Sequence, residues 1–144
     1  MEQLKIKKLD EKAKLPTYGT VDSAGADLYA VLNNELSIKP GETKVIPTGL
    51  SMAIPKGYVG LIYARSSLGT KKGLAPANKV GVIDADYRGE VKVVLFNQSN
   101  ETQIISPEER IAQIIITPYV KVDFEEVSEL SETERGNGGF GSTN

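Results

Sequence analysis

The stretch NKVGVIDADYRGEVKVVLFN, residues 78–97, places two apolar runs on either side of a polar segment. VGVI (80–83) and EVKVVLFN (90–97) are rich in β-branched residues, which favour β-strands. The segment between them, DADYRG (84–89), holds aspartate and glycine, which are common in turns. We therefore predict two strands that pair as a β-hairpin.

Outward from this stretch, the chain reads as short strands separated by turns. Its 7 prolines and 14 glycines leave little room for long helices. Only SSLGTKKG (66–73) fits a short helix, with Ser66 or Ser67 as the N-cap and Gly73 as the stop. We predict an all-β sandwich or jelly-roll-like barrel. Its further strands are expected at residues 4–9, 26–32, 35–40, 43–54, 58–65, 102–105 and 110–120.

The composition changes once, at SELSETERGNGG (128–139), which is polar and then glycine-rich. We expect a β-barrel domain over residues 1–127 and a flexible C-terminal arm over residues 128–144. The glycines of the arm cannot build a core, and ordering them costs much backbone entropy. A frayed terminus is one interpretation of this segment.

The end of the arm, RGNGGFGSTN (135–144), also has the composition of a ligand lid. Glycine N–H groups together with Arg135 and the hydroxyls of Ser142 and Thr143 can cradle a phosphate. The ring of Phe140 can stack on a base, because every base has a π face. A glycine-rich segment of this kind can close over a bound ligand.

The composition excludes several classes of chemistry. The 144 residues include no Cys and no His, so disulfide frameworks, thiolate metal sites and Ser-His-Asp triads are ruled out. Catalysis must then use carboxylates, bound metal, or Lys, Tyr or Ser. The net charge of −2 argues against binding a long nucleic acid, but a single nucleotide needs only a few local cations. The N-terminus lacks the apolar core of a signal peptide, and we expect a cytoplasmic protein.

Two stretches hold candidate chemical groups. Asp84 can act as a general base that takes a proton from water, although an aspartate in a turn is often only structural. In ARSSLG (64–69), Arg65 and two serine hydroxyls precede a helical turn, which suits an anion. The alternative there is a capped helix with a solvated arginine.

Two further stretches carry polar groups among apolar residues. Asp27 enters a strand in SAGADLYA (23–30), where an acid is usually structural. Arg110 and Gln113 lie among aliphatic residues in ERIAQIII (109–116). Either they are solvated side chains of an edge strand, or Arg110 orients a carboxylate and Gln113 donates to a ligand.

Taken together, five stretches closely resemble the successive motifs of the trimeric dUTP diphosphatase (dUTPase) family. They are SAGADLYA, ARSSLG, GVIDADYRGE, ERIAQI and RGNGGFGST, and the resemblance covers residues 20–144. It implies a jelly-roll-like subunit in a homotrimer whose active sites draw on all three chains. It also implies hydrolysis of dUTP to dUMP and pyrophosphate with Mg²⁺, which keeps uracil out of DNA and supplies dUMP for thymidylate synthesis. Neither a polymeric nucleic acid nor a membrane is an expected partner.

The resemblance also implies roles for single residues. Asp84 is the base that deprotonates the attacking water, Tyr87 packs under the deoxyribose, and Lys92 lines the same pocket. Asp27 acts on the metal through water, while the Mg²⁺ ion is held mainly by the triphosphate. Uracil is read by Asn78 and the hairpin backbone at Val80, Gly81, Val82 and Ile83. Phosphates are bound by Arg65, Ser66, Ser67, Gln113, Arg135, Gly141, Ser142 and Thr143, and Phe140 stacks on uracil.

The chain departs from the family pattern in three places. Ala64 replaces a common proline, Glu108 replaces a common glycine, and Asn144 ends the chain where relatives usually have glycine. The nearest alternative is a dCTP deaminase of related fold, which uses a glutamate on the strand after the turn; Val94 occupies that position here. A regulatory or binding protein that keeps the dUTPase pocket is a second alternative. A purely structural jelly-roll module leaves the arm unexplained.

Overall fold

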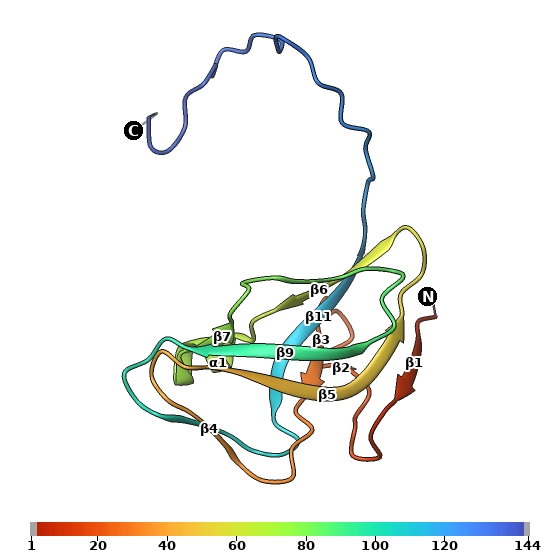
Figure 1. Ribbon diagram of the computed structural model, residues 1–144, viewed down its shortest axis with the longest axis vertical. Helices are drawn as coiled ribbons and strands as arrows, with labels where there is room; N and C mark the ends of the chain where they lie inside the picture. Colours follow the sequence, from red (N-terminus) through yellow and green to blue (C-terminus); the bar gives the residue numbers. More distant parts are fainter. Residues whose placement is uncertain (1–2, 143–144) are drawn as a thin grey trace.

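The computed structural model describes residues 3–142, which form short antiparallel strands and a single short helix (Figure 1). This confirms the predicted all-β, jelly-roll-like architecture. Within this range, no helix has the length and apolar character needed to cross a membrane. The strands are β1 (Lys5–Lys8), β2 (Thr17–Tyr18), β3 (Ala26–Tyr29), β4 (Leu36–Ile38), β5 (Thr43–Ala53), β6 (Tyr58–Tyr63), β7 (Leu74–Pro76), β8 (Gly81–Ile83), β9 (Glu90–Asn97), β10 (Gln103–Ile105) and β11 (Arg110–Pro118).

Two main sheets enclose the core. The four-stranded sheet has the order β1-β5-β9-β7 and the five-stranded sheet the order β2-β3-β11-β6-β8, while β10 and β4 form a separate pair. Burial alternates along β9, where Val91, Val93 and Leu95 point inward and Lys92 is exposed. This alternation is expected of a strand with one face on the core. Leu28 of β3 and Leu50 of β5 are fully buried between the sheets.

The predicted hairpin between residues 80–83 and 90–97 is wrong. Both strands exist, but β8 pairs with β6 in one sheet while β9 pairs with β5 and β7 in the other. The segment between them therefore crosses from sheet to sheet. Hydrogen bonds hold this crossing; among them, the Tyr87 N–H donates to the Asp84 carbonyl at 3.1 Å, and the Arg88 guanidinium donates to the Ala85 carbonyl at 2.7 Å.

The pairing of β8 leaves it at the end of the five-stranded sheet. Its three residues face β6 along one edge, with Val82 opposite Leu61. Along the other edge, no strand within residues 3–142 pairs with it. The backbone N–H and C=O groups on that edge are thus available to a ligand.

The helix α1 (Ser66–Lys72) forms where it was predicted. Gly73 ends it in the left-handed conformation, with φ of 63°, and its N–H donates to the Leu68 carbonyl. The predicted serine N-cap is wrong, because the N-cap is Arg65 and makes no side-chain capping bond. The Ser67 hydroxyl instead accepts a hydrogen bond from the Arg65 guanidinium at 3.1 Å.

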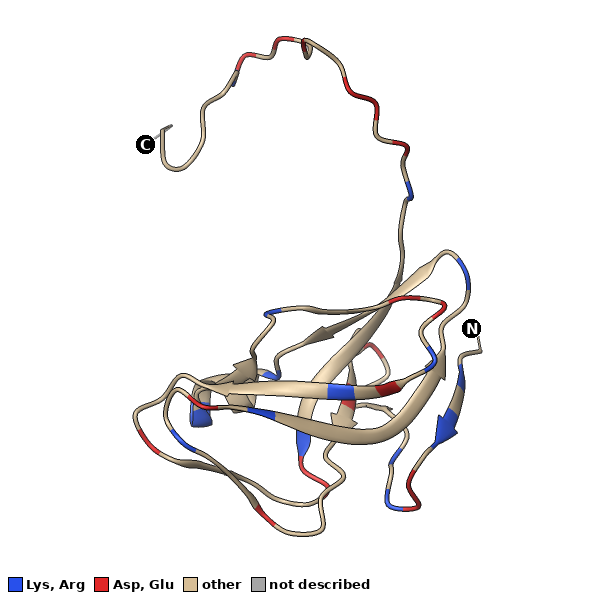
Figure 2. Cartoon of the chain, in the orientation of Figure 1, with Lys and Arg blue, Asp and Glu red and all other residues tan. Residues whose placement is uncertain are grey.

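The chain leaves the barrel after β11, ahead of the C-terminal arm that begins at residue 128. Residues 119–142 form no helix or strand, and in Figure 1 they extend away from the sheets and curve back. Acidic residues recur along this segment (Figure 2). Its hydrogen bonds from residue 133 to residue 142 lie within the arm itself.

Candidate active site

The first part of the candidate site is a hollow of about 250 Å³ beside the sheet crossing, here called the Asp84 hollow. It is lined by the end of β8, the crossing segment and the start of β9, namely Val82, Ile83, Asp84, Tyr87, Glu90 and Lys92. Five of these six were predicted as site residues from the sequence. Asp84 is exposed to solvent here, which its predicted role as a base acting on water requires.

Tyr87 is held at its backbone and at its phenolic hydroxyl within the Asp84 hollow. Its backbone N–H binds the Asp84 carbonyl at 3.1 Å, and its phenolic hydroxyl donates to the Glu90 carbonyl at 2.8 Å. The ring also lies over Gly89, where an added Cβ would come within 2.6 Å of the ring carbon that carries the hydroxyl. Asp84 and the Tyr87 ring are therefore held in one hydrogen-bonded turn.

Glu90 is a lining residue that the sequence analysis missed. Its carboxylate accepts the Gly49 N–H at 3.0 Å, at an irregularity in β5 where the register with β9 shifts between Pro47 and Leu50. The Thr48 hydroxyl donates to the Val91 carbonyl at the same irregularity. No local signal in the sequence marks Glu90, since the contact joins strands 41 residues apart.

The residues predicted to read uracil lie on and beside β8. Gly81 and Ile83 belong to the strand, and Val80 precedes it at 37% exposure. The Asn78 amide lies alongside, because a Cβ built at Gly81 would be 3.4 Å from Asn78 Nδ2. These groups thus come from an edge strand rather than from a hairpin.

The second part is a hollow of about 410 Å³, here called the Arg65 hollow, on the outer side of the five-stranded sheet. Three stretches that were expected to bind phosphate or act on the metal meet here: SAGADLYA, ARSSLG and ERIAQI. The fourth such stretch, RGNGGFGST, lies in the arm. The lining is Gly19, Ser23, Ala24, Gly25, Asp27, Arg65, Ser66, Arg110, Gln113 and Ile115.

Asp27 joins the two arginines of the Arg65 hollow. Arg65 Nε donates to one carboxylate oxygen at 2.7 Å, and Arg110 Nη1 lies 3.4 Å from the other. The Asp27 side chain is only 13% exposed. Because a guanidinium has five N–H donors, both arginines keep donors for a ligand. With two cations and one anion, the Arg65 hollow has the charge and donors that suit a phosphate.

Gln113 contacts the chain rather than open space. Its Nε2 donates to the Ala64 carbonyl at 2.9 Å, so it ties β11 to the residue before Arg65. Ser67 does not line the Arg65 hollow and reaches it only through its bond to Arg65. The two hollows share no lining residue within residues 3–142.

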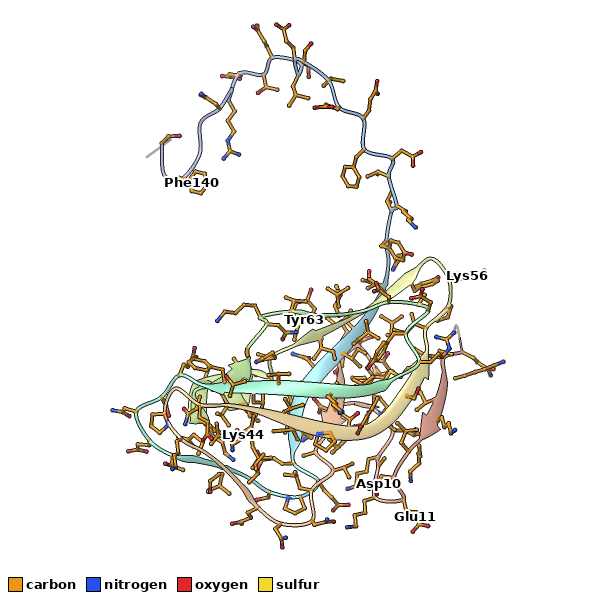
Figure 3. All side chains as sticks on the ribbon, in the orientation of Figure 1. Asp10, Glu11, Lys44, Lys56, Tyr63 and Phe140 are labelled. Carbon is orange, nitrogen blue, oxygen red and sulfur yellow. The ribbon has the colours of Figure 1, made fainter. Side chains whose placement is uncertain are left out.

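The arm residues lie apart from both hollows in the single chain. Figure 3 shows Phe140 near the end of the arm, away from the barrel, and its side chain is fully exposed. Arg135 Nε donates to the Gly138 carbonyl at 2.9 Å, and the Ser142 N–H donates to the Gly139 carbonyl at 3.0 Å. Gly141 lies in this second turn with φ of 86°. Thr143 falls outside the described residues.

Comparison with known proteins was made at the levels of family, sequence and structure. A family model described as dUTPase matches residues 11–144. Among the most similar relatives are two enzymes named deoxyuridine 5'-triphosphate nucleotidohydrolase. That of Nautilia profundicola is 52% identical over 98% of both chains, and that of Rickettsia felis is 49% identical over 98% of this chain and 96% of its own.

Solved structures give the same answer. The dUTPase of Staphylococcus bacteriophage 80alpha with dUPNHPP is 28% identical, covers 100% of this chain and 99% of its own, and has a TM-score of 0.86. A variant dUTPase from phage phi11 of S. aureus, whose structure concerns the coordination of a structural Mg(II) ion, is 25% identical, covers 91% of this chain and 100% of its own, and has a TM-score of 0.81. With a family match over residues 11–144 and 52% identity across nearly the whole length, the chain belongs to the dUTPase family.

Proposed function

We propose that this protein hydrolyses dUTP to dUMP and pyrophosphate. The observation that carries the proposal is the exposed Asp84 in a hollow shared with Tyr87, in a chain of the dUTPase family. A nucleotide needs one place for its base and sugar and another for its phosphates. The Asp84 hollow and the Arg65 hollow have the chemistry for these two parts.

Asp84 is the general base of the reaction. Its carboxylate takes a proton from a water molecule while the water oxygen forms a bond to the α-phosphorus. The bond from that phosphorus to the bridging oxygen breaks on the opposite side, and pyrophosphate leaves with the bonding electrons. With no histidine in the chain, a carboxylate is the natural group for this step.

Base and sugar selection is assigned to β8 and Tyr87. The free edge of β8 offers backbone donors and acceptors, and the Asn78 amide adds both kinds of group. A site of this type rejects cytosine because the polar groups that a bound base covers would be left mispaired. Tyr87, fixed by its bond to the Glu90 carbonyl, packs under the deoxyribose and leaves no room for a 2′-hydroxyl.

The phosphates are assigned to the Arg65 hollow, with Arg65, Ser66 and Gln113 as donors and Ser67 acting on Arg65. Mg²⁺ usually binds one or two carboxylates together with substrate phosphates. Residues 3–142 hold no group of three or more His, Cys, Asp or Glu side chains suited to a metal. The single carboxylate of Asp27 in the Arg65 hollow fits an ion that is held mainly by the triphosphate. Asp27 would hold its hydration shell. When bound, Mg²⁺ spreads the negative charge of the phosphate chain.

We further propose a homotrimer in which each site draws on neighbouring chains. Two observations support it: the two hollows share no lining residue, and the arm lies apart from both. In the trimer, the arm of one chain would close over a neighbour's site. Arg135 would then reach the γ-phosphate, Phe140 would stack on uracil, and Gly141, Ser142 and Thr143 would contact the phosphate chain.

The test of the function is a product assay with Mg²⁺ and each of dUTP, dCTP, dTTP and UTP. We expect pyrophosphate from dUTP and little from the other three. The same assay separates the deaminase alternative, in which dCTP would release ammonia. Ammonia from dCTP without pyrophosphate from dUTP would refute the proposed function.

A further inference from the structure

We infer that Gly25 is a positioning residue that orients the Gln113 amide toward the phosphates of the substrate. The inference rests on the proposed function, because it takes the Arg65 hollow as the phosphate site. Gly25 lies in the loop before β3 and Gln113 lies in β11, and both line that hollow. Gly25 has no hydrogen-bonding side chain, so its effect must act through the residue packed against it.

The missing side chain of Gly25 makes room for Gln113. A Cβ built on Gly25 would fall 2.1 Å from Gln113 Oε1 and 2.9 Å from its Cδ, far closer than two such atoms can approach. Gly25 does not have a positive φ. Its backbone conformation is thus open to any residue, and only the contact with the Gln113 amide requires glycine.

The position of the amide also fixes its direction. Nε2 uses one of its two N–H groups on the Ala64 carbonyl at 2.9 Å, while Oε1 packs on Gly25. A rotated amide would set its own carbonyl against the Ala64 carbonyl, which is unfavourable. The second N–H of Nε2 is therefore the one left for a ligand.

The bond from Gln113 to the Ala64 carbonyl also positions Arg65. The Ala64 carbonyl belongs to the residue just before Arg65, and Asp27 is the neighbour of Gln113 across the β3–β11 pairing. A Gln113 amide displaced by a methyl group at residue 25 would release the Ala64 carbonyl. Both the amide donor and the start of the Arg65 loop would then move, and phosphate binding would weaken.

The experiment uses the full chain with Mg²⁺, takes inorganic pyrophosphate as the probe, and measures its binding by titration calorimetry. The variants are Gly25→Ala, Gln113→Ala and the double variant. Gly69→Ala is the matched control, because a Cβ at Gly69 on α1 would meet no atom within 4 Å. Deoxyuridine, which has no phosphate, is the second probe. This titration does not depend on turnover of dUTP, so a failed assay of the proposed function would be seen separately.

We expect Gly25→Ala and Gln113→Ala each to weaken pyrophosphate binding about tenfold, the size of one lost hydrogen bond to a charged group. Deoxyuridine binding should stay unchanged in both, and Gly69→Ala should match the wild type with both probes. The double variant should bind like Gln113→Ala alone, since the nearest atom to the added methyl is then the Cβ at position 113, at 3.3 Å.

The double variant also covers the case in which Gly25→Ala does not fold, because removing the amide restores the space. Wild-type affinity for pyrophosphate in Gly25→Ala would overturn the inference. So would losses that add in the double variant, or an equal loss of deoxyuridine binding.

Discussion

At the scale of the residue, the structure shows what backbone conformation Glu108 adopts where the family commonly has glycine. Glu108 has φ of 64°, in the left-handed region, within a turn closed by the Glu109 N–H and the Ser106 carbonyl at 3.1 Å. Pro107 precedes it, which makes this a type II turn, and such turns favour glycine at that position. The turn over residues 39–42 has the same form and carries Gly41, with φ of 74°. The family's glycine is thus the residue that suits the backbone.

We predict that Glu108→Gly raises the free energy of unfolding by about 0.5 kcal/mol. Relief of the left-handed strain contributes roughly 1–2 kcal/mol, and the greater entropy of glycine in the unfolded chain offsets part of it. The exposed ion pair of Glu108 with Lys14 at 3.4 Å contributes little. Urea denaturation measures the change, and Gly41→Ala is the control, which should destabilise the protein. A less stable Glu108→Gly variant would contradict this explanation.

Ala64, another departure, has a different explanation. The group that matters at this position is its backbone carbonyl, which accepts the hydrogen bond from Gln113. Any residue supplies that carbonyl, so the exchange of proline for alanine leaves the contact intact. The sequence shows which side chain has changed, but it cannot show that the backbone makes the contact.

At the scale of the element, strand positions were predictable and strand partners were not. The runs at 43–54 and 90–97 became β5 and β9, because β-branched residues and breakers give local signals. Whether β8 pairs with β9 or with β6 depends on the whole set of buried faces. The strands β2 and β7 were missed. The two residues of β2 are too few to show an alternating pattern, and β7 ends on Pro76, a residue that is rare within strands.

The arm is the element whose role can be tested separately from the fold. We predict that deleting residues 135–144 leaves a folded barrel, because the described part of that segment, residues 135–142, adds no residue to the buried core. Pyrophosphate release from dUTP should fall strongly, since Arg135 and Phe140 are lost. Thermal unfolding measures the first effect and the product assay the second. Full activity of the truncated protein would show that the arm has no part in the site.

At the scale of the whole molecule, the single chain leaves apolar surface uncovered. A hollow of about 540 Å³ borders the outer face of β6 and β8 and the segment that follows β11, with Leu61, Val82, Val122 and Phe124 in its lining. Val82 is 61% exposed and Phe124 is 96% exposed. Exposed apolar surface of this kind marks a protein interface. No pattern in the sequence counts subunits, so the number three comes from the family resemblance alone.

We predict that the protein sediments as a trimer of its 15.5 kDa chain at the concentrations used for assays. The reason is that the two hollows share no lining residue within residues 3–142 and that apolar surface at Val82 and Phe124 is exposed in the single chain. Sedimentation equilibrium gives the mass directly. A monomer with full activity would rule out shared active sites.

The central claim is that Asp84 is the base that activates water for the attack on dUTP. Its most direct test compares Asp84→Asn with Asp86→Asn, a neighbouring aspartate that does not line the Asp84 hollow. The measurement is the rate of pyrophosphate release at saturating dUTP, with nucleotide affinity measured in parallel. Asp84→Asn should lose roughly 10²–10⁴-fold in rate while still binding nucleotide, as expected for a lost general base, and Asp86→Asn should stay near the wild type. An unchanged rate in Asp84→Asn would contradict the account.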